Sequence, residues 1–580
     1  MQHILLTVLG TKADKTCYAL NGKHVQARLA PLALFELLPD TDLPGHVYAL
    51  CTSQAREIAF PVLQEGLSDK AEVTCIDVPD IEGPSPQEGI YAFMSKVADI
   101  IAKSKCQSLS LDITHGFRHL SFLTYAIALF TSALMGLEIR GAYYGLHSDS
   151  SSVSPFLDLK PLLELPDWIH GIRVLGETGS AAAIAKILKR ATDSCSREIA
   201  RDLQRMSEAY LSGLPLEVGC VMRRLLREKI RPLRRILRND HRLPLSDELI
   251  SQLEAALYPL ALPEDSVFPK WEKSKVQLTR EELTRQARYI NTLIEQNNIT
   301  TALGVMREWT VSWALWQQGG ECAGWLDHKT CRKKVEHALN SLRSVYGDPS
   351  TRGLLTKDQK DLAKFWKDLA DLRNAYHHNG MRKEDLSKNN KINEDLQSIS
   401  NYWKYLSSCP TVKLDFSDET TILVSPIGNH PGVLYSALKN SQAALNKYPD
   451  YCAVICSNSS KKAVPKVLEI AEYTGQVIYL TLDDPHAGYS EIERLITEVK
   501  QLIARSATVL VNLTGGTTLM GMAASEIAAK ARALGRTVRR FALVDRRTPQ
   551  EQEADPYIIS ESLWLDKLDS TEGFAYEYDD

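Results

Sequence analysis

Both ends of this 580-residue chain alternate short apolar runs with helix-like runs, whereas the long middle shows no strand pattern. Strands that alternate with helices predict a parallel sheet with right-handed crossovers and helices on its faces. Helical periodicity without strands predicts an all-helical domain. We therefore expect an α/β plus all-α protein in three domains, a Rossmann-like sheet domain at 1–175, a helical domain at 176–410 and a second Rossmann-like domain at 411–580.

Composition narrows the class of protein. Hydrophobic residues make up 44% of the chain and charged residues 24%, which is typical of a globular protein. The net charge of −4 means that any contact with RNA must come from a local patch. The 11 cysteines form no CxxC pair, which argues against a zinc site and a disulfide scaffold. No apolar run approaches the roughly 18 residues of a membrane span, and the N-terminus lacks signal-peptide features, so a cytoplasmic location is expected.

The N-terminal part is predicted to hold five strands of a parallel sheet. They are His3–Leu9, His46–Cys51, Glu72–Val78, Ser108–Ile113 and Glu138–Tyr144. Ligands of such sheets bind beyond the carboxyl ends of the strands. The loops at those ends contain Gly10 and Thr11, Thr52 and Ser53, and the segment 112–118.

The segment LDITHGFRHL carries the densest set of polar groups. Its candidate ligand-binding residues are Asp112, Thr114, His115, Gly116 and Arg118. A glycine at a helix start lets backbone N–H groups face an anion, and an arginine can add a fork to a phosphate. The alternative is that Asp112 and Thr114 only cap the following helix.

The C-terminal part repeats this architecture. Its predicted strands are Thr421–Val424, Cys452–Cys456, Gln476–Thr481, Thr508–Asn512 and Thr537–Val544, the last of which closes the pattern. The candidate ligand-binding residues after the strands are Ser425, Ile427, Gly428, Ser457, Asn458, Asn512, Thr514, Gly515, Gly516 and Thr517. Paired glycines permit close backbone approach, which suits an anion or a nucleotide ribose. The alternative is a tight turn without a ligand. No G-x-G-x-x-G follows the first strand of either sheet, and no P-loop is present.

The middle part contains a densely basic stretch. Its cations are Arg223, Arg224, Arg227, Lys229, Arg231, Arg234, Arg235, Arg238 and Arg242. Such a run is usually a solvated helix face or a salt-bridged surface between domains. Contact with RNA is the alternative interpretation.

The segment DLRNAYHHNG, residues 371–380, is the candidate catalytic element. It places Arg373 and His378 five residues apart near the end of a predicted helix, with Asn374 one turn from His378. A second match to the same spacing, Arg332 and His337 in CRKKVEH, lacks the asparagine and is interpreted as surface charge.

Three of these motifs resemble known families. The string DITHGFRH resembles the DxTHG motif of CRISPR-associated proteins with a CARF domain, a Rossmann-like sensor of cyclic oligoadenylates. The opening strand with its Gly-Thr loop and the segment SPFLDLKPLLELPDWIHGIR are similar to that family as well. The string NLTGGTTLM resembles the TGGT loop of another CARF branch, and RNAYHH resembles the RNxxxH motif of HEPN nucleases.

The resemblance implies a homodimeric or larger endoribonuclease of type III CRISPR defence that a cyclic oligoadenylate, cyclic tetra-adenylate by expectation, activates to cut single-stranded RNA. It implies metal-independent chemistry without a cofactor. His378 would move a proton, and Arg373 would stabilise phosphoryl charge. Asn374 would orient either of these two side chains or the RNA. Two chains would pair their motif helices to complete one site.

Several alternatives stay open. The second sheet domain would either bind the activator or degrade the ring as a timer. The whole chain would otherwise be a non-catalytic nucleotide-sensing regulator with a helical dimerisation module. A toxin-like ribonuclease that needs no cyclic ligand is a third interpretation.

Overall fold

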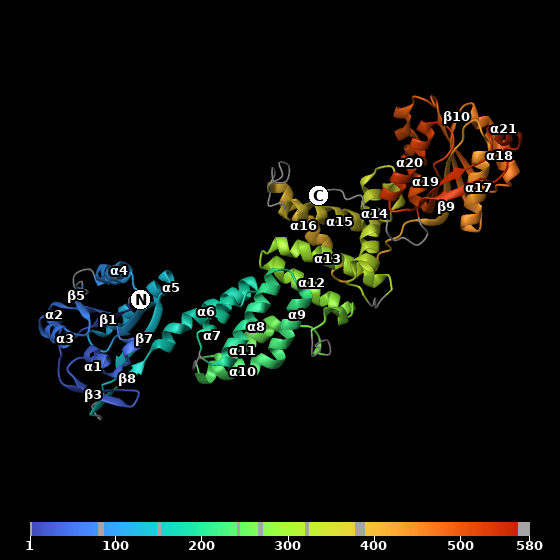
Figure 1. Cartoon of the computed structure of the whole chain (residues 1–580). Helices are drawn as coiled ribbons and strands as arrows, with labels where there is room; N and C mark the ends of the chain where they lie inside the picture. The colour runs from blue at the N-terminus through green and yellow to red at the C-terminus, as the bar shows by residue number, and fades with distance from the viewer. Residues whose placement is uncertain are drawn as a thin grey trace. The chain divides into compact units, whose positions relative to one another are not determined.

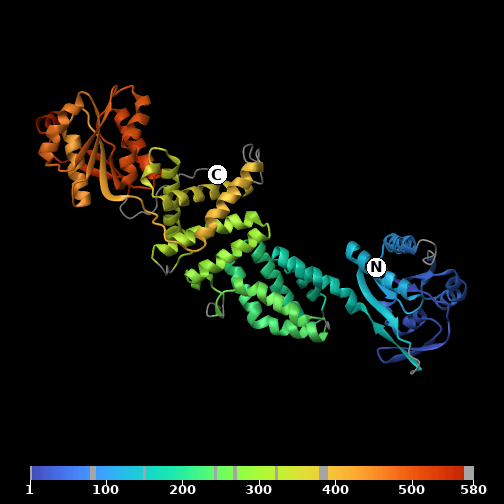
Figure 2. The same cartoon turned by 180° about the vertical axis from the view of Figure 1, so that it is seen from behind.

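The structure is a computed structural model. It describes residues 3–78, 86–147, 152–191, 193–240, 244–264, 271–319, 324–377 and 389–566. The chain divides into two compact units, Met1–Ser207 with Arg224–Ala256, and Glu208–Arg223 with Leu257–Asp580. The expected combination of parallel-rich sheets and helices is confirmed, and Figures 1 and 2 show it from opposite sides. The three domain boundaries stay predictions. Within the described part of the chain, no helix has the length and apolar character that crossing a bilayer requires.

The N-terminal sheet has eight strands in the order β3-β2-β8-β7-β6-β1-β4-β5. The strands are β1 (His3–Val8), β2 (Thr16–Leu20), β3 (Lys23–Ala27), β4 (His46–Cys51), β5 (Glu72–Asp77), β6 (Ser108–Asp112), β7 (Glu138–Gly145) and β8 (Val153–Asp158). The five predicted strands pair in parallel. The sequence analysis missed β2, β3 and β8, of which β8 runs antiparallel to β7.

Helices cover both faces of this sheet. They are α1 (Ala30–Leu37), α2 (Ser53–Ile58), α3 (Phe60–Gly66), α4 (Pro86–Ser104) and α5 (Arg118–Met135). Alternate residues of β1 point to opposite faces. Leu6 packs with α4 and α5 residues such as Phe93, whereas Leu5 packs with α3 residues such as Leu63. Both faces of the central strands are therefore buried, as expected for a parallel sheet.

The C-terminal sheet repeats the strand order of the first. It runs β14-β13-β12-β9-β10-β11, which matches β8-β7-β6-β1-β4-β5 strand for strand, and β14 pairs antiparallel with β13 as β8 does with β7. Its strands are β9 (Asp418–Pro426), β10 (Tyr451–Ser457), β11 (Gln476–Leu482), β12 (Ser506–Asn512), β13 (Thr537–Val544) and β14 (Glu561–Trp564). The prediction that Thr537–Val544 closes the pattern is wrong, because β14 follows and pairs with β13.

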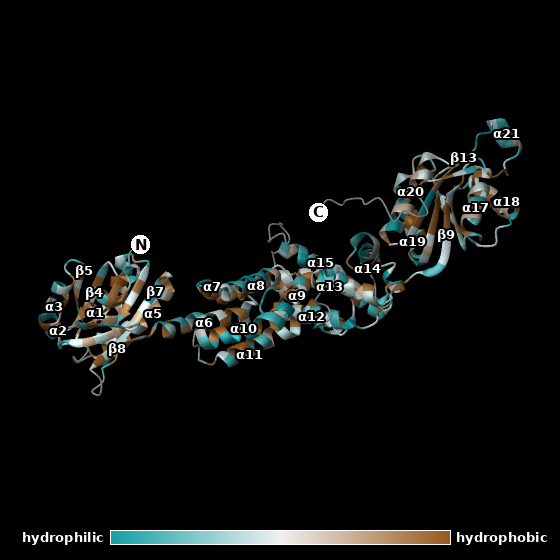
Figure 3. Ribbon diagram, turned by 60° about the horizontal axis from the view of Figure 1, so that its bottom comes forward, coloured by the Kyte–Doolittle hydropathy of each residue, from teal (hydrophilic) through white to brown (hydrophobic). Residues whose placement is uncertain are grey.

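The C-terminal helices are α17 (Gly432–Leu445), α18 (Val464–Ala471), α19 (Ile492–Arg505), α20 (Thr518–Ala533) and α21 (Pro549–Ala554). Figure 1 shows α17 and α18 on one side of the sheet and α19 and α20 on the other. Figure 3 shows α21 in the hydrophilic colour, in agreement with its lack of buried residues.

The described residues between the two sheets form helices and connecting turns. The main helices are α6 (Lys160–Thr178), α7 (Ala182–Lys189), α8 (Ser194–Leu211), α9 (Pro215–Arg224), α10 (Ile230–Arg235), α11 (Ser246–Leu257), α12 (Arg280–Glu295), α13 (Ile299–Gln317), α14 (Lys333–Gly347), α15 (Lys357–His377) and α16 (Asn389–Leu406). The basic stretch identified in the sequence falls on α9 and α10, and π-helical turns at Leu225–Lys229 and Ile236–Asp240 interrupt the α-helical geometry there.

Buried tryptophans hold the helices of the second unit together. Trp309 of α13 donates to the Leu283 carbonyl of α12 at 2.8 Å and packs edge-on against Trp403 of α16. Trp366 of α15 donates to the Asn340 side chain of α14 at 2.8 Å. Burial of a large apolar side chain contributes about 1.5–3 kcal/mol. The helix α15, which carries the candidate catalytic motif, is therefore anchored to α14 by a buried tryptophan.

Candidate functional site

The loop after β6 is fixed to the sheet by side chains. Asp112 is fully buried, and its carboxylate accepts from the Thr7 hydroxyl of β1 at 2.7 Å and from the Thr114 amide at 3.1 Å. The Thr114 hydroxyl accepts from the Gly145 amide of β7 at 2.9 Å. Three neighbouring strands are thereby joined at their carboxyl ends. Asp112 and Thr114 hold the loop, and neither caps α5, whose N-cap position is Phe117.

Two glycines let the loops after β1 and β6 touch. A Cβ on Gly10 would lie 3.0 Å from the Gly116 amide nitrogen. Gly116 itself has φ +84°, and a Cβ there would lie 2.5 Å from Val8. Only glycine fits such a conformation without strain. The predicted residues Gly10 and Gly116 therefore lie together, with exposed Thr11 and Arg118 beside them in sequence.

The His115 ring is engaged inside the protein. Its Nε2 accepts from the Ala30 amide at the start of α1 at 3.0 Å and lies 3.3 Å from the Tyr18 hydroxyl. Burial lowers the pKa of His115 below the ordinary value, against an opposing effect from Asp112. These contacts give His115 a role in holding α1 to the loop.

The loop after β4 holds the other two predicted residues of this edge. The Thr52 side chain caps α2 by accepting from the Ala55 amide at 3.3 Å, and Ser53 begins that helix and is exposed. Among residues that the sequence analysis missed, Thr7 is the clearest. Its signal was a hydroxyl within the otherwise apolar run ILLTVL.

The loop after β12 repeats the bonding of the loop after β6. Asn512 is fully buried, donates to the Ser425 hydroxyl of β9 at 3.0 Å and accepts from the Thr514 amide at 2.9 Å. The Thr514 hydroxyl accepts from the Leu543 amide of β13 at 2.8 Å. The chemistry is inverted at one position: Asp112 accepts a hydrogen bond from β1, whereas Asn512 donates one to β9.

The glycine contact is repeated as well. A Cβ on Gly428 would lie 2.8 Å from the Gly516 Cα, and Gly515 and Gly516 have φ values of +108° and +73°. Thr517 caps α20 by accepting from the Met520 amide, and its hydroxyl also donates to the Pro485 carbonyl. Backbone amides at the exposed Gly516 thus border the start of α20.

The remaining predicted residues of this edge differ in exposure. Ile427 is fully buried, and its amide donates to the Ile455 carbonyl at 2.9 Å. Ser457 is buried, and its hydroxyl lies 2.8 Å from that of Ser459. Asn458 is exposed. Ile427 and Ser457 are therefore buried parts of this sheet edge, whereas the Asn458 side chain is exposed to solvent.

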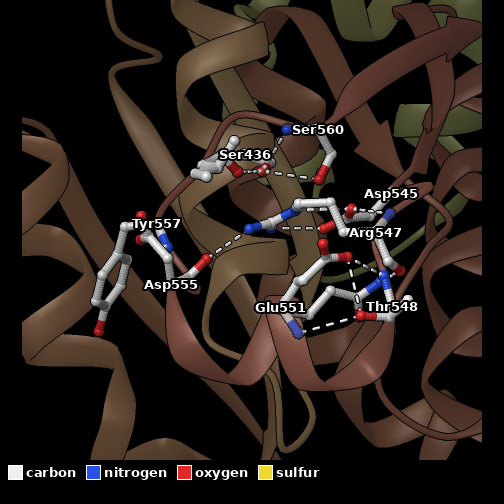
Figure 4. Close-up of polar contacts among 10 residues, drawn as sticks. Ser436, Asp545, Arg547, Thr548, Glu551, Asp555, Tyr557 and Ser560 are labelled. Carbon is white, nitrogen blue, oxygen red and sulfur yellow. Dashed lines mark hydrogen bonds and ion pairs between the residues drawn. The ribbon is translucent and has the colours of Figure 1, made fainter.

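The segment after β13 closes the same edge with a network that the sequence analysis did not anticipate. Figure 4 shows the Arg547 guanidinium held by the Asp545 carboxylate at 2.7 and 3.0 Å and by the Asp555 carbonyl at 2.7 Å. The side chains of Thr548 and Glu551 form a capping box at the start of α21. A Cβ on Gly432 of α17 would lie 1.9 Å from the Pro556 carbonyl oxygen, so this segment rests directly on α17.

The motif helix α15 presents part of the predicted catalytic set. Asn374 is exposed and Arg373 is half-buried, and the Arg373 guanidinium donates to the Asn374 side-chain oxygen at 3.3 Å. Asp371, two residues before Arg373, pairs with Arg343 of α14 at 3.1 Å. His378 lies outside the described residues, so its position relative to Arg373 stays a prediction.

The interpretation of CRKKVEH as surface charge is wrong for its arginine. Arg332 is buried, donates to the Ser312 hydroxyl of α13 at 3.1 Å and pairs with Glu308 at 2.7 Å. Partial burial, followed by the charges of Arg536 and Lys333, lowers the pKa of His337. The arginine of the second R-x4-H match therefore belongs to the packing against α13, whereas His337 is exposed.

Comparison with known proteins gives a partial likeness in sequence and a weak likeness in structure. No family model matches the chain. Enterococcus italicus Csm6 bound to cyclic hexa-2'-fluoro-hexa-dAMP aligns with 72% of this chain and 96% of its own, at 11% identity and a TM-score of 0.34. A TM-score of this size does not establish a shared fold.

The CRISPR-associated protein MJ1674 of Methanocaldococcus jannaschii is 30% identical over 148 residues. The match covers 24% of this chain and spans 22% of the length of that curated relative. The chain is thus similar, over about a quarter of its length, to a CRISPR-associated protein.

Proposed function

We propose that the chain is a cyclic-oligoadenylate-activated endoribonuclease of type III CRISPR defence that cuts single-stranded RNA. The observation that carries this proposal is the duplicated loop geometry, in which the same side-chain and glycine contacts recur at the carboxyl edges of two sheets with one strand order. The DxTHG and TGGT resemblances fall on these two loops. The partial likeness to a CRISPR-associated protein supports the same class.

The loops suit a phosphodiester ring because they offer backbone rather than bulky side chains. Gly116 and Gly516 are exposed, and each precedes the start of a long helix, α5 and α20. Helix starts present unpaired amides and a positive dipole end to an anion. Arg118 is exposed at the first position of α5 and adds a cation.

For the second sheet the geometry favours ligand binding over ring cleavage. Ser425 and Asn512 are fully buried and bonded to each other. Both side chains hold the loop, so neither is directed at a bound phosphate. A ring bound here would be sensed through the backbone and through the exposed Asn458.

The proposed cutting site lies at the end of α15. The RNA 2′-hydroxyl attacks the adjacent phosphorus and the 5′-oxygen leaves. His378 transfers a proton, and Arg373 stabilises the charge on the phosphoryl oxygens. The Arg373–Asn374 contact holds the guanidinium at the exposed end of the helix. A second chain supplies the matching half.

The experiment is cleavage of a fluorogenic single-stranded RNA in EDTA, with cyclic tri-, tetra- and hexa-adenylate added separately. Cleavage with one ring, cyclic tetra-adenylate by expectation, supports the proposal and identifies the activator. Cleavage without any ring supports the toxin-like alternative.

The non-catalytic regulator is tested with the His378→Ala variant. Loss of cleavage with the melting temperature and oligomer mass unchanged supports the enzyme. His337→Ala serves as the control, because His337 belongs to the other R-x4-H match. Equal cleavage by the wild type and His378→Ala would leave the regulator as the better interpretation.

A further inference from the structure

The basic stretch at 223–242 separates into two sets of residues. One set is engaged within the fold. Arg223 donates to the Leu262 carbonyl, Arg224 pairs with Asp202, Arg227 with Glu228, Lys229 with Glu198, and Arg234 with Asp247 and Glu254. In the second set, Arg231, Arg235 and Arg238 are exposed, and no carboxylate among the described residues lies within ion-pairing distance of them. Arg242 lies outside the described residues.

Two of the ion pairs join α8 to the helical segment 224–235, which is called the second helix below. Asp202 pairs with Arg224 at 2.6 Å, and Glu198 pairs with Lys229 at 2.6 Å. The bridges advance along α8 while they step back along the second helix, so the two helices run antiparallel. They lie in the part of the chain drawn from teal to green in Figure 1.

Each helix carries a row of exposed arginines beside this contact. On α8 the row is Arg197, Arg201 and Arg205, and on the second helix it is Arg227, Arg231 and Arg235. Arg205 also pairs with Asp202, and Arg227 with Glu228. Both rows repeat every fourth residue, which keeps each row on one side of its helix. Arg197 and Arg201 precede the bridging acids by one residue, about 100° around the axis. The row of Arg227, Arg231 and Arg235 is rotated in the same sense from the bridging residues of the second helix. Because the two helices are antiparallel, both rows face the same outward side.

Three arginines of this surface, Arg201, Arg231 and Arg235, form no ion pair with the described residues. Arg201 reaches the Arg197 carbonyl at 3.4 Å and has no acidic partner among the described residues. Arginines four residues apart repel each other by a few tenths of a kcal/mol per pair. Two adjacent rows of such pairs, in a chain whose net charge is −4, concentrate positive charge at a small cost to the helices.

We propose that this two-helix arginine surface binds the backbone of single-stranded RNA. Arginine forks match phosphate oxygens in geometry and remain charged at every working pH. An exposed cationic row fits a polyanion that is recognised through its phosphates and not its bases. The choice of RNA among polyanions rests on the proposed ribonuclease function, and the surface would be a second RNA contact besides the Arg373 site.

The experiment compares RNA affinity in the full chain, in the His378→Ala background so that the RNA stays intact. The test variant carries Arg201→Gln, Arg231→Gln and Arg235→Gln. Binding of a fluorescein-labelled oligouridylate is followed by anisotropy over a salt series. The expected result is a Kd at least tenfold higher at low salt. The slope of log Kd against log salt should also fall by about 2, since each lost phosphate contact removes about 0.7.

A matched variant, with Lys23→Gln, Lys103→Gln and Lys334→Gln, removes the same charge from other exposed positions and should bind within about twofold of the parent. The proposal is overturned if the arginine variant binds as the lysine variant does. It is also overturned if the parent binds no RNA at low salt, which would direct attention to an acidic protein partner. Ring-dependent cleavage by the wild type is read separately. If the wild type shows no ring-dependent cleavage while the affinity difference persists, the proposed function is wrong and the RNA-binding surface is still supported.

Discussion

At the scale of single residues, the two ligand loops are held by one buried side chain each. Asp112 and Asn512 occupy the same place, directly after the strand, and both receive the amide two residues ahead. The difference lies in their partners. A carboxylate can only accept, so β1 supplies the Thr7 hydroxyl as donor, whereas the amide of Asn512 donates to Ser425.

Replacing Asn512 by alanine should destabilise the second unit by about 2–3 kcal/mol, because the Thr514 amide and the Ser425 hydroxyl lose their partners inside the fold. Chemical denaturation followed by tryptophan fluorescence measures the change. Asn458→Ala, at an exposed position of the same sheet edge, is the control and should stay within about 0.5 kcal/mol of the wild type.

Gly428→Ala should disrupt the loop contact, because its Cβ would lie 2.8 Å from the Gly516 backbone. Binding of cyclic oligoadenylate to the second sheet should weaken at least tenfold, measured by calorimetry. Gly521→Ala is the matched control. It sits inside α20, its Cβ meets the Leu513 carbonyl oxygen at an ordinary 3.5 Å, and it should leave binding unchanged. Equal binding by both variants would show that the glycine contact is not required.

The lowered pKa of His115 makes the first sheet sensitive to acid. A histidine whose pKa is depressed on folding stabilises the native state above its ordinary pKa of 6.5, and this contribution is lost as the pH falls below that value. Protonation at Nε2 also removes the acceptor of the Ala30 amide. The melting temperature of the wild type should therefore drop between pH 7.5 and 5.5 more steeply than that of His115→Gln. Parallel profiles would contradict this expectation.

At the scale of elements, α14 connects the second sheet to the motif helix. At one end Asp348, directly after α14, pairs with Lys500 of α19 and lies 3.9 Å from Lys530 of α20. Within α14, Arg343 pairs with Asp371 of α15, two residues before Arg373. A shift of α19 and α20 can therefore reach α15 through one helix.

Asp348→Asn should lower the denaturation midpoint of the second unit and weaken activation by a ring bound to the second sheet. Burial alone would raise the pKa of Asp348, but the hydrogen bonds from Lys500 and Ser350, together with the charge of Lys500, outweigh it and lower the pKa to about 2. The contribution of the pair is present above the ordinary pKa of 3.8 and lost as the pH falls towards 2. Asp483→Asn, at an exposed position of the same unit, is the control. Unchanged activation would exclude this route.

At the scale of the whole molecule, the proposed ribonuclease site needs two chains. Specific activity with saturating ring should rise with protein concentration and level off where sedimentation shows a dimer. Mixing the wild type with excess His378→Ala should reduce activity per wild-type chain, because mixed pairs carry one complete half-site. A monomer with full activity at every concentration would contradict the paired site.

The sequence predicted the parallel strands and the glycine loops because both depend on local patterns. The five parallel strands of each sheet were found within a few residues of their observed bounds. The strands β8 and β14, which run antiparallel to β7 and β13, were missed because alternating or short runs look like loops. The burial of Arg332 was missed because its partners Ser312 and Glu308 lie on another helix, and nothing in the local string CRKKVEH reveals them.

The loop bonds in both sheets are complete without any ligand. Thr7, Asp112 and Thr114 satisfy one another and the neighbouring strands, and so do Ser425, Asn512 and Thr514. A homologous domain can therefore lose its ligand and still retain the motif, because selection for a stable fold preserves the same residues. Surveys that count receptors by these motifs in genomes will then overestimate how many of them still receive a signal.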